Sequence, residues 1–114
     1  MTEKGGGAIV NIGALGALRG EGTMSGYCCA KGTVMKLTES LSDELRPAGI
    51  NVNAVAPGIM LTEPVKQQVS GREADYISKI PLGRLGNPDD VPLIYKVMQQ
   101  EDSSDKVRMQ AVES

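Results

Sequence analysis

Residues 49–58 read GINVNAVAPG, a segment in which apolar and small polar side chains alternate between two glycines. Alternation over this length is typical of a β-strand. Pro57-Gly58 stops the pattern, because proline cannot donate to a sheet ladder. We therefore predict a strand over residues 50–56. Arg46-Pro47-Ala48-Gly49 predicts the end of a helix just before it, since proline disfavours helical geometry at Arg46 and glycine permits a left-handed turn.

A helix and another strand precede this segment. The strongest helical pattern of the chain runs from Gly26 or Tyr27 to Leu45, with apolar residues at spacings of three and four. Ser25 is the expected N-cap. Residues 7–14 read GAIVNIGA, a short run rich in β-branched residues, and predict a buried strand. The order of strand, loop, helix and strand predicts one right-handed βαβ unit with parallel strands.

The connecting loop and the elements after the βαβ unit give weaker patterns. Residues 15–25 are rich in glycine and are expected to form a loop, the kind of segment that often carries function. Residues 62–70 and 72–79 predict two short helices. Asn87-Pro88-Asp89-Asp90 predicts a helix start, with asparagine at the cap, proline at the first position and acids in the first turn. We expect that helix to run to about Gln100.

The end of the chain differs in composition from the rest. Residues 101–114 read EDSSDKVRMQAVES, are mostly polar and contain no clear strand, so we expect a disordered tail after a domain of residues 1–100. The predicted class of that domain is α/β: a partial, Rossmann-like, doubly wound fold made of one parallel βαβ unit plus additional helices. With only two strands expected, we predict that apolar surface stays exposed.

Length and composition limit the functions that are possible. With 114 residues, 40% hydrophobic and 23% charged, the chain is expected to be one globular domain or part of one. A net charge of −2 without a basic cluster argues against nucleic-acid or membrane partners. No apolar run resembles a secretory leader, so we expect a cytoplasmic protein. Cys28 and Cys29 are adjacent and histidine is absent, which predicts reduced core thiols and no metal site.

Tyr27 and Lys31 are the first candidates for chemistry. They lie four residues apart at the start of the long helix, so both side chains project from one face. A phenol, with an ordinary pKa of about 10, is a poor acid at neutral pH, but an ammonium one turn away favours its ionised form and lowers that pKa. A tyrosine of this kind exchanges a proton with a carbonyl or alcohol oxygen. The same spacing also occurs by chance in helices without a catalytic role.

The context of the pair is more specific than the pair itself. The chain resembles the short-chain dehydrogenase/reductase family of nicotinamide-dependent oxidoreductases in five segments, which follow the family's order and together cover roughly residues 5–91. The segments are GAIVNI at 7–12, YxxxK at 27–31, LTESL at 37–41, GINVNAVAPG at 49–58 and IPLGRLGNPDDV at 80–91.

The resemblance implies a role for each matching residue. The family's tyrosine at the position of Tyr27 is the general acid/base, and its lysine at the position of Lys31 lowers the tyrosine's pKa and hydrogen-bonds the nicotinamide ribose. Four further residues match positions that border the nicotinamide: Pro57, Gly58, Met60 and Thr62. The implied cofactor is NAD or NADP, and the implied substrate is a small carbonyl compound or alcohol. The family residues that select between NAD and NADP lie upstream of the matched segments.

One position departs from the family in a way that affects chemistry. The family has a serine thirteen residues before its tyrosine, which hydrogen-bonds the substrate oxygen, and this chain has Ala14 there. By analogy with the loss of one oxyanion-hole donor, the absence of that hydroxyl is expected to slow carbonyl reduction roughly 100- to 1,000-fold. Thr23 or Ser25 from the neighbouring loop could replace it.

The family's dinucleotide fingerprint, a glycine-rich turn after the first strand, lies upstream of the matched segments and is not found here. Gly20-x-Gly22-x-x-Ser25 imitates it superficially, but its third position is serine and no predicted strand comes directly before it. We reject it as a cofactor motif. The chain is therefore expected to be the truncated catalytic half of such an enzyme, with weak or no activity and weak cofactor binding by itself.

Two further interpretations remain open from the sequence. The chain could be a non-enzymatic interaction module derived from this fold, which forms homo-oligomers through the helix at residues 27–45, since the matching helix of the family packs in a subunit interface. It could also be an incomplete gene product without a function. Cofactor titration separates the enzyme from the interaction module.

Overall fold

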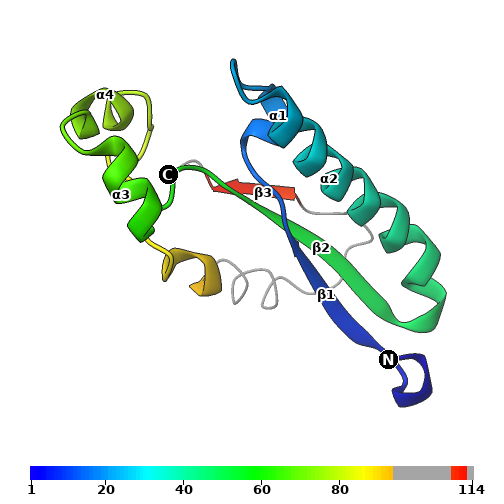
Figure 1. Ribbon diagram of the computed structural model, residues 1–114. Helices are drawn as coiled ribbons and strands as arrows, with labels where there is room; N and C mark the ends of the chain where they lie inside the picture. Colours follow the sequence, from blue (N-terminus) through cyan, green and yellow to red (C-terminus); the bar gives the residue numbers. More distant parts are fainter. Residues whose placement is uncertain (94–108, 113–114) are drawn as a thin grey trace.

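The computed structural model describes residues 1–93 and 109–112. Figure 1 shows the arrangement of the elements. In chain order they are η1 (Thr2–Lys4), β1 (Gly7–Ile12), α1 (Gly16–Arg19), α2 (Ser25–Leu45), η2 (Arg46–Ala48), β2 (Ile50–Pro57), α3 (Glu63–Val69), α4 (Glu73–Ile77) and β3 (Met109–Val112).

The described strands form one parallel sheet in the order β1-β2-β3. β1 pairs with β2 from Gly7 opposite Ile50 to Ile12 opposite Val55, so the two strands end at the same edge of the sheet. The parallel βαβ unit predicted from the sequence is thereby confirmed, and so is the partial α/β class of the fold. Ligands of open parallel sheets bind at this edge, outside the carboxyl ends of the strands.

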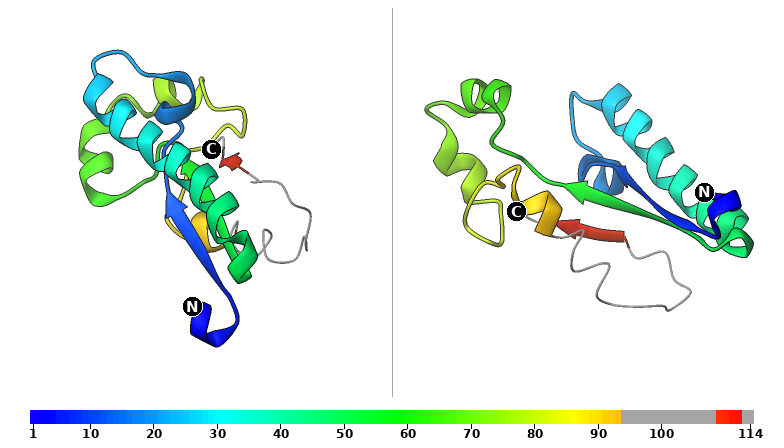
Figure 2. Two further views of the ribbon diagram at one scale, coloured as in Figure 1. Left: turned by 90° about the vertical axis from the view of Figure 1, so that its right-hand side faces the viewer. Right: turned by 90° about the horizontal axis from the view of Figure 1, so that it is seen from below.

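Small residues on β2 let α2 pack closely against the sheet. α2 runs along one face of it, as both views in Figure 2 show. Ala54 and Ala56 are fully buried beneath the helix and form the core cluster with Met35, while Ala17 of α1 packs against the same cluster. Because two alanines occupy this part of the strand, β2 leaves room for the Met35 side chain of α2.

A buried hydrogen-bonded pair also fixes α2 to the sheet. Thr38 of α2 is completely buried, and its Oγ1 accepts a hydrogen bond of 2.9 Å from Nδ2 of Asn11 on β1. The same hydroxyl donates to the carbonyl of Val34, at 2.8 Å. Since an unpaired buried polar group is costly, this chain of two bonds specifies how α2 lies over β1.

The ends of α2 differ in two details from the sequence prediction. Ser25 is the first helical residue and not the N-cap; Met24 precedes the helix without a side-chain cap. Its carbonyl accepts the bond from Cys28 N at 2.9 Å, which starts the helix one residue early. At the other end Arg46 keeps helical dihedrals and leads into η2, because Pro47 stands at the start of that short helix, where no N–H is needed. Gly49 adopts the predicted left-handed turn, with φ of 68°.

Three other sequence predictions need correction. The segment 15–25 contains the short helix α1, where only a loop was expected. Cys29 is exposed and Cys28 is half-buried, because α2 turns only Met35 and Thr38 fully inward, so Cys29 is not a core thiol. Met109–Val112 forms β3, although no strand was expected in the tail, since a short strand paired to a central neighbour needs little pattern of its own.

The predicted elements after β2 are present. α3 and α4 lie within the expected segments 62–70 and 72–79. At the next predicted helix start, Oδ1 of Asn87 accepts a hydrogen bond from Asp89 N at 3.0 Å, and Oδ2 of Asp90 accepts one from Asn87 N at 2.9 Å. This reciprocal capping confirms the start. The expected continuation to Gln100, and most of the expected disordered tail, lie outside the described residues, and the division at residue 100 stays a prediction.

The described residues contain neither a membrane-spanning helix nor a cluster of metal-binding side chains. No helix in residues 1–93 combines the length and the apolar character needed to cross a membrane. In the same part of the chain, no group of three or more histidine, cysteine, aspartate or glutamate side chains is placed to hold a metal ion.

The Asn11–Thr38 bond gives a first prediction. Thr38→Val keeps the side-chain shape but leaves Nδ2 of Asn11 without its partner, so we expect a loss of about 1–3 kcal/mol in the free energy of unfolding. In an Asn11→Leu background the same substitution should cost much less, because the amide is already gone. Urea unfolding of the four proteins measures both costs. Equal costs in the two backgrounds would contradict the bond's role.

The helix start at Asn87 gives a prediction on pH. The Arg84 guanidinium, and after it the backbone N–H of Asn87, hold the pKa of Asp90 below its ordinary value. A carboxylate with a lowered folded-state pKa stabilises the fold above its unfolded pKa of about 3.9, and this contribution is lost as the pH falls through the folded value. We expect Asp90→Asn to reduce the acid-induced loss of stability. Asp89→Asn, whose carboxylate makes neither bond, is the control and should change the acid-induced loss less than Asp90→Asn does.

Candidate functional site

A cavity of about 680 Å³ opens at the carboxyl ends of β1 and β2. Its volume lies in the range of small-molecule sites. One wall comes from the turn after β1, α1 and the first turns of α2, and the other comes from the segment after β2 with α3 and α4. Every site residue predicted from the sequence lines it, together with the departing position: Tyr27, Lys31, Pro57, Gly58, Met60, Thr62 and Ala14.

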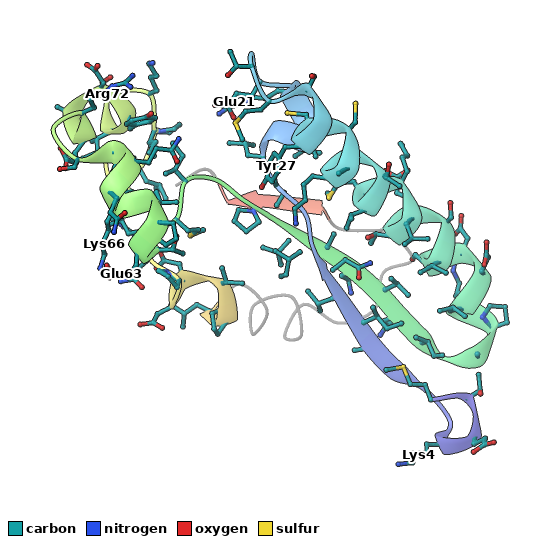
Figure 3. The ribbon with its side chains drawn as sticks, in the orientation of Figure 1. Lys4, Glu21, Tyr27, Glu63, Lys66 and Arg72 are labelled. Atoms are coloured by element: carbon teal, nitrogen blue, oxygen red, sulfur yellow. The ribbon has the colours of Figure 1, made fainter. Side chains whose placement is uncertain are left out.

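Tyr27 and Lys31 reach the cavity from the first turns of α2. Figure 3 shows Tyr27 at the end of α2 that faces α3 and α4, and its side chain is 46% exposed. Lys31, one turn further on, is half-buried, and its Nζ donates a hydrogen bond of 2.9 Å to the carbonyl of Ile12, the last residue of β1. This bond holds the ammonium at the end of β1, on the same wall of the cavity as the phenol.

The segment after β2 forms the floor of the cavity. The carbonyl of Pro57, where β2 ends, accepts a hydrogen bond from Leu15 N at 2.9 Å, which joins it to the turn after β1. Met60 pairs with Gly86 in an isolated parallel bridge. Thr62 precedes α3 as its N-cap residue, but its side chain makes no capping hydrogen bond, so the hydroxyl is available to a ligand.

Ala14 is 6% exposed and lines the cavity with a methyl group where the resembling family has a hydroxyl. The two loop residues that could have replaced this hydroxyl do not line the cavity. Thr23 is exposed and held in a left-handed conformation with φ of 68°, and Ser25 is exposed at the start of α2. The suggestion that either one supplies the missing donor is therefore wrong in this structure.

The Gly20-x-Gly22 imitation of a cofactor fingerprint also receives no support. Gly20 follows helix α1 and not a strand, and its φ of 67° serves the chain reversal between α1 and α2. A phosphate-binding turn of the family type needs a strand directly before it and a helix N-terminus directly after it.

Apart from Lys31, the charged residues that line the cavity were not predicted from the sequence. Arg19 and Glu21 reach the cavity from α1 and the loop after it, and Lys79 reaches it from the segment after α4. Tyr76 lines it from α4, with the Arg72 guanidinium 5.5 Å from the centre of its ring. The glycine-rich loop was recognised as a functional segment, but no spacing rule connects Arg19 with a lysine sixty residues further along the chain.

A family comparison matches nearly the whole chain. The family profile described as "Enoyl-(Acyl carrier protein) reductase" matches residues 1–111. The "Inactive 2-(S)-hydroxypropyl-CoM dehydrogenase 2" of Xanthobacter autotrophicus is 39% identical over 97 residues, which are 80% of this chain and 42% of that protein. The 3-oxoacyl-[acyl-carrier-protein] reductase FabG of Haemophilus influenzae is 33% identical over 103 residues, or 90% of this chain and 43% of that protein. The chain thus spans less than half the length of these relatives.

Solved structures show the same fold. The chain "ElxO with NADP Bound" superposes with a TM-score of 0.85 at 30% identity, over 98% of this chain and 47% of that one. A short-chain type dehydrogenase/reductase from Mycobacterium ulcerans superposes with a TM-score of 0.87 at 27% identity, over 98% of this chain and 42% of that one.

Proposed function

Because this chain belongs to the short-chain dehydrogenase/reductase family, we propose that it serves NAD(P)-dependent hydride transfer between a carbonyl compound and an alcohol in the cytoplasm. The observation that carries the proposal is the shared cavity: Tyr27, Lys31 and the segment from Pro57 to Thr62 line one space at the carboxyl ends of two parallel strands. The NADP of the ElxO structure supports the choice of cofactor class.

The residues present fit the nicotinamide and ribose end of such a cofactor. Nζ of Lys31 uses one N–H for Ile12 and keeps two for a ribose hydroxyl. The uncapped hydroxyl of Thr62 and the backbone of Pro57-Gly58 offer hydrogen bonds to a carboxamide or a phosphate. Among residues 1–93 and 109–112, no strand is followed by a G-x-G-x-x-G turn for the diphosphate. Binding through the nicotinamide end alone would be weak.

Tyr27 is the proposed proton donor. When bound and reduced, the nicotinamide supplies the hydride to the carbonyl carbon. The hydroxyl of Tyr27 donates its proton to the carbonyl oxygen, which becomes the alcohol hydroxyl, and the tyrosine is left as a phenolate. Lys31, held in place by the Ile12 carbonyl, stabilises that negative charge. In the oxidative direction the phenolate takes the proton of the alcohol.

The alanine at position 14 is expected to limit the rate of carbonyl reduction. Ala14→Ser would add the hydroxyl that polarises the carbonyl, so we expect the rate of carbonyl reduction to rise roughly 100- to 1,000-fold. Ala14→Cys, of similar size but with a much weaker donor, should gain little. Oxidation of NADPH or NADH, followed by absorbance, measures the rates.

Tyr27→Phe should abolish turnover in both the original and the Ala14→Ser background, because the proton donor is lost. Unchanged rates with phenylalanine at position 27 would remove Tyr27 from the mechanism.

The second candidate function, an interaction module, is favoured by the outer face of α2. Cys29, Thr33 and Leu37 follow one another at four-residue spacing on that face and are exposed, and Leu37 keeps 50% of its surface accessible. A face of small side chains around an exposed leucine on a long helix can pack against a second copy of the chain.

Titration with a dinucleotide separates the two candidates. The enzyme proposal predicts saturable binding of NADP or NAD to the purified chain, measured by calorimetry, and weakening by Lys31→Met. The interaction module predicts no saturable binding, together with association that grows with protein concentration in sedimentation and is lost in Leu37→Lys. This second result would contradict the enzyme proposal.

A further inference from the structure

Arg19 and Lys79 line opposite walls of the cavity, and neither forms an ion pair within the part of the chain that the structure describes. Arg19 ends α1 on one wall, and Lys79 follows α4 on the other. Figure 1 shows α1 and α4 on opposite sides of the carboxyl ends of β1 and β2. Of the described residues that line the space, Glu21 is the single carboxylate, and the third cation, Lys31, is engaged with the Ile12 carbonyl.

The lack of partners sets these two cations apart from most of the others. Elsewhere in residues 1–93, four lysines and arginines each form an ion pair with a nearby acid: Lys36, Arg46, Lys66 and Arg84. Arg19 and Lys79 form no ion pair with any residue that the structure describes. Lys4 and Arg72 also form no ion pair within the described residues, but they do not line the cavity. Besides Lys31, Arg19 and Lys79 are therefore the cations of the cavity that remain available to a ligand.

The Glu21 carboxylate forms no ion pair with Arg19 or Lys79. Its Oε2 lies 3.7 Å from the point where a Cβ on Gly16 would stand, so the carboxylate is turned toward the start of α1. In Figure 3, Glu21 and Tyr27 lie at the same end of the α1–α2 wall. Between the two walls the lining is largely apolar, with Leu15, Met24, Val65, Val69 and Ile80.

From these charges we propose that the substrate carries an anionic group besides its reacting carbonyl or hydroxyl, and that Arg19 and Lys79 bind this group. The inference rests on the proposed function only for the reacting oxygen at Tyr27. A carboxylate, sulfonate or phosphate shares the required chemistry: the planar guanidinium of Arg19 offers two parallel N–H donors, and Lys79 adds a compact positive charge. Glu21 would weaken the same contact by repulsion.

The test compares two ketones that differ in charge. Levulinate and its methyl ester share the ketone, and only levulinate carries a carboxylate. We expect the full chain to bind levulinate more tightly than methyl levulinate at low ionic strength, with affinities measured by ligand-observed NMR. Arg19→Gln and Lys79→Gln should each weaken levulinate binding about two- to fivefold, and Glu21→Gln should strengthen it, while binding of the ester stays constant. Added salt should reduce the difference between the ketones.

Lys66→Gln is the control, because Lys66 pairs with Glu63 on α3 and does not line the cavity. This substitution should leave levulinate binding unchanged. Equal affinity for the two ketones, or a charge preference that survives in the Arg19→Gln/Lys79→Gln double variant, would overturn the inference. Far-ultraviolet circular dichroism checks that each variant is folded. Levulinate should be displaced by acetate, methanesulfonate or inorganic phosphate. The anion that displaces it at the lowest concentration identifies the anionic group as a carboxylate, a sulfonate or a phosphate.

The two proposals fail in different experiments. The ketone comparison needs neither cofactor nor turnover, so a missing charge preference overturns the anionic substrate and leaves the role of Tyr27 as it was. Turnover that survives Tyr27→Phe overturns the proposed mechanism and leaves the binding of an anion by Arg19 and Lys79 intact.

Discussion

The parallel pairing of β1 with β2 is the constraint on which the site depends. Because the strands run in the same direction, Ile12 and Pro57 end at one edge of the sheet, and the chain must cross back along α2 between them. The start of α2 therefore stands beside the end of β1, where the Ile12 carbonyl accepts the bond from Lys31. The Asn11–Thr38 bond about three turns further along, together with the packing of Met35 on Ala54 and Ala56, fixes the orientation of the helix and so holds Tyr27 on the same wall. A shift of α2 along the sheet would separate the phenol, the ammonium and the Pro57-Gly58 turn.

Much of this arrangement could be predicted from the sequence because it rests on local patterns. Alternation fixes β2, the spacing of three and four fixes α2, and Gly49 adopts the left-handed turn that its position requires. The cavity-lining set from Tyr27 to Thr62 could be named through the order of the family segments. The misses have long-range causes. α1 is only four residues long and is positioned by packing of Ala17 on the core, β3 is a strand through its pairing with β2, and Arg19 and Lys79 line one cavity only in the folded chain.

The cavity contains some of the groups that the proposed reaction needs and lacks others. Tyr27 and Lys31, the proposed acid/base and ribose-binding groups, line the cavity, but Ala14 offers no donor to the reacting oxygen, and the described residues contain no turn for the cofactor's diphosphate. A substrate with an anionic group that Arg19 and Lys79 bind would partly compensate for the missing hydroxyl donor at position 14. An anionic group held between Arg19 and Lys79 would orient the carbonyl toward Tyr27 by ionic contacts at the far end of the molecule, since binding energy from a non-reacting part can position the reacting atoms.

We propose that Tyr27, Lys31 and the Pro57–Thr62 segment together bind the nicotinamide end of the cofactor in one cavity. The most direct test of this proposal is protein-observed NMR of the isotopically labelled chain, titrated with reduced nicotinamide mononucleotide, which carries only the half of the cofactor that these residues fit. We expect saturable shifts of the Tyr27 ring and of the Gly58 and Thr62 amides, which disappear in Lys31→Met. Shifts confined to residues outside the cavity, or none at millimolar ligand, would contradict it.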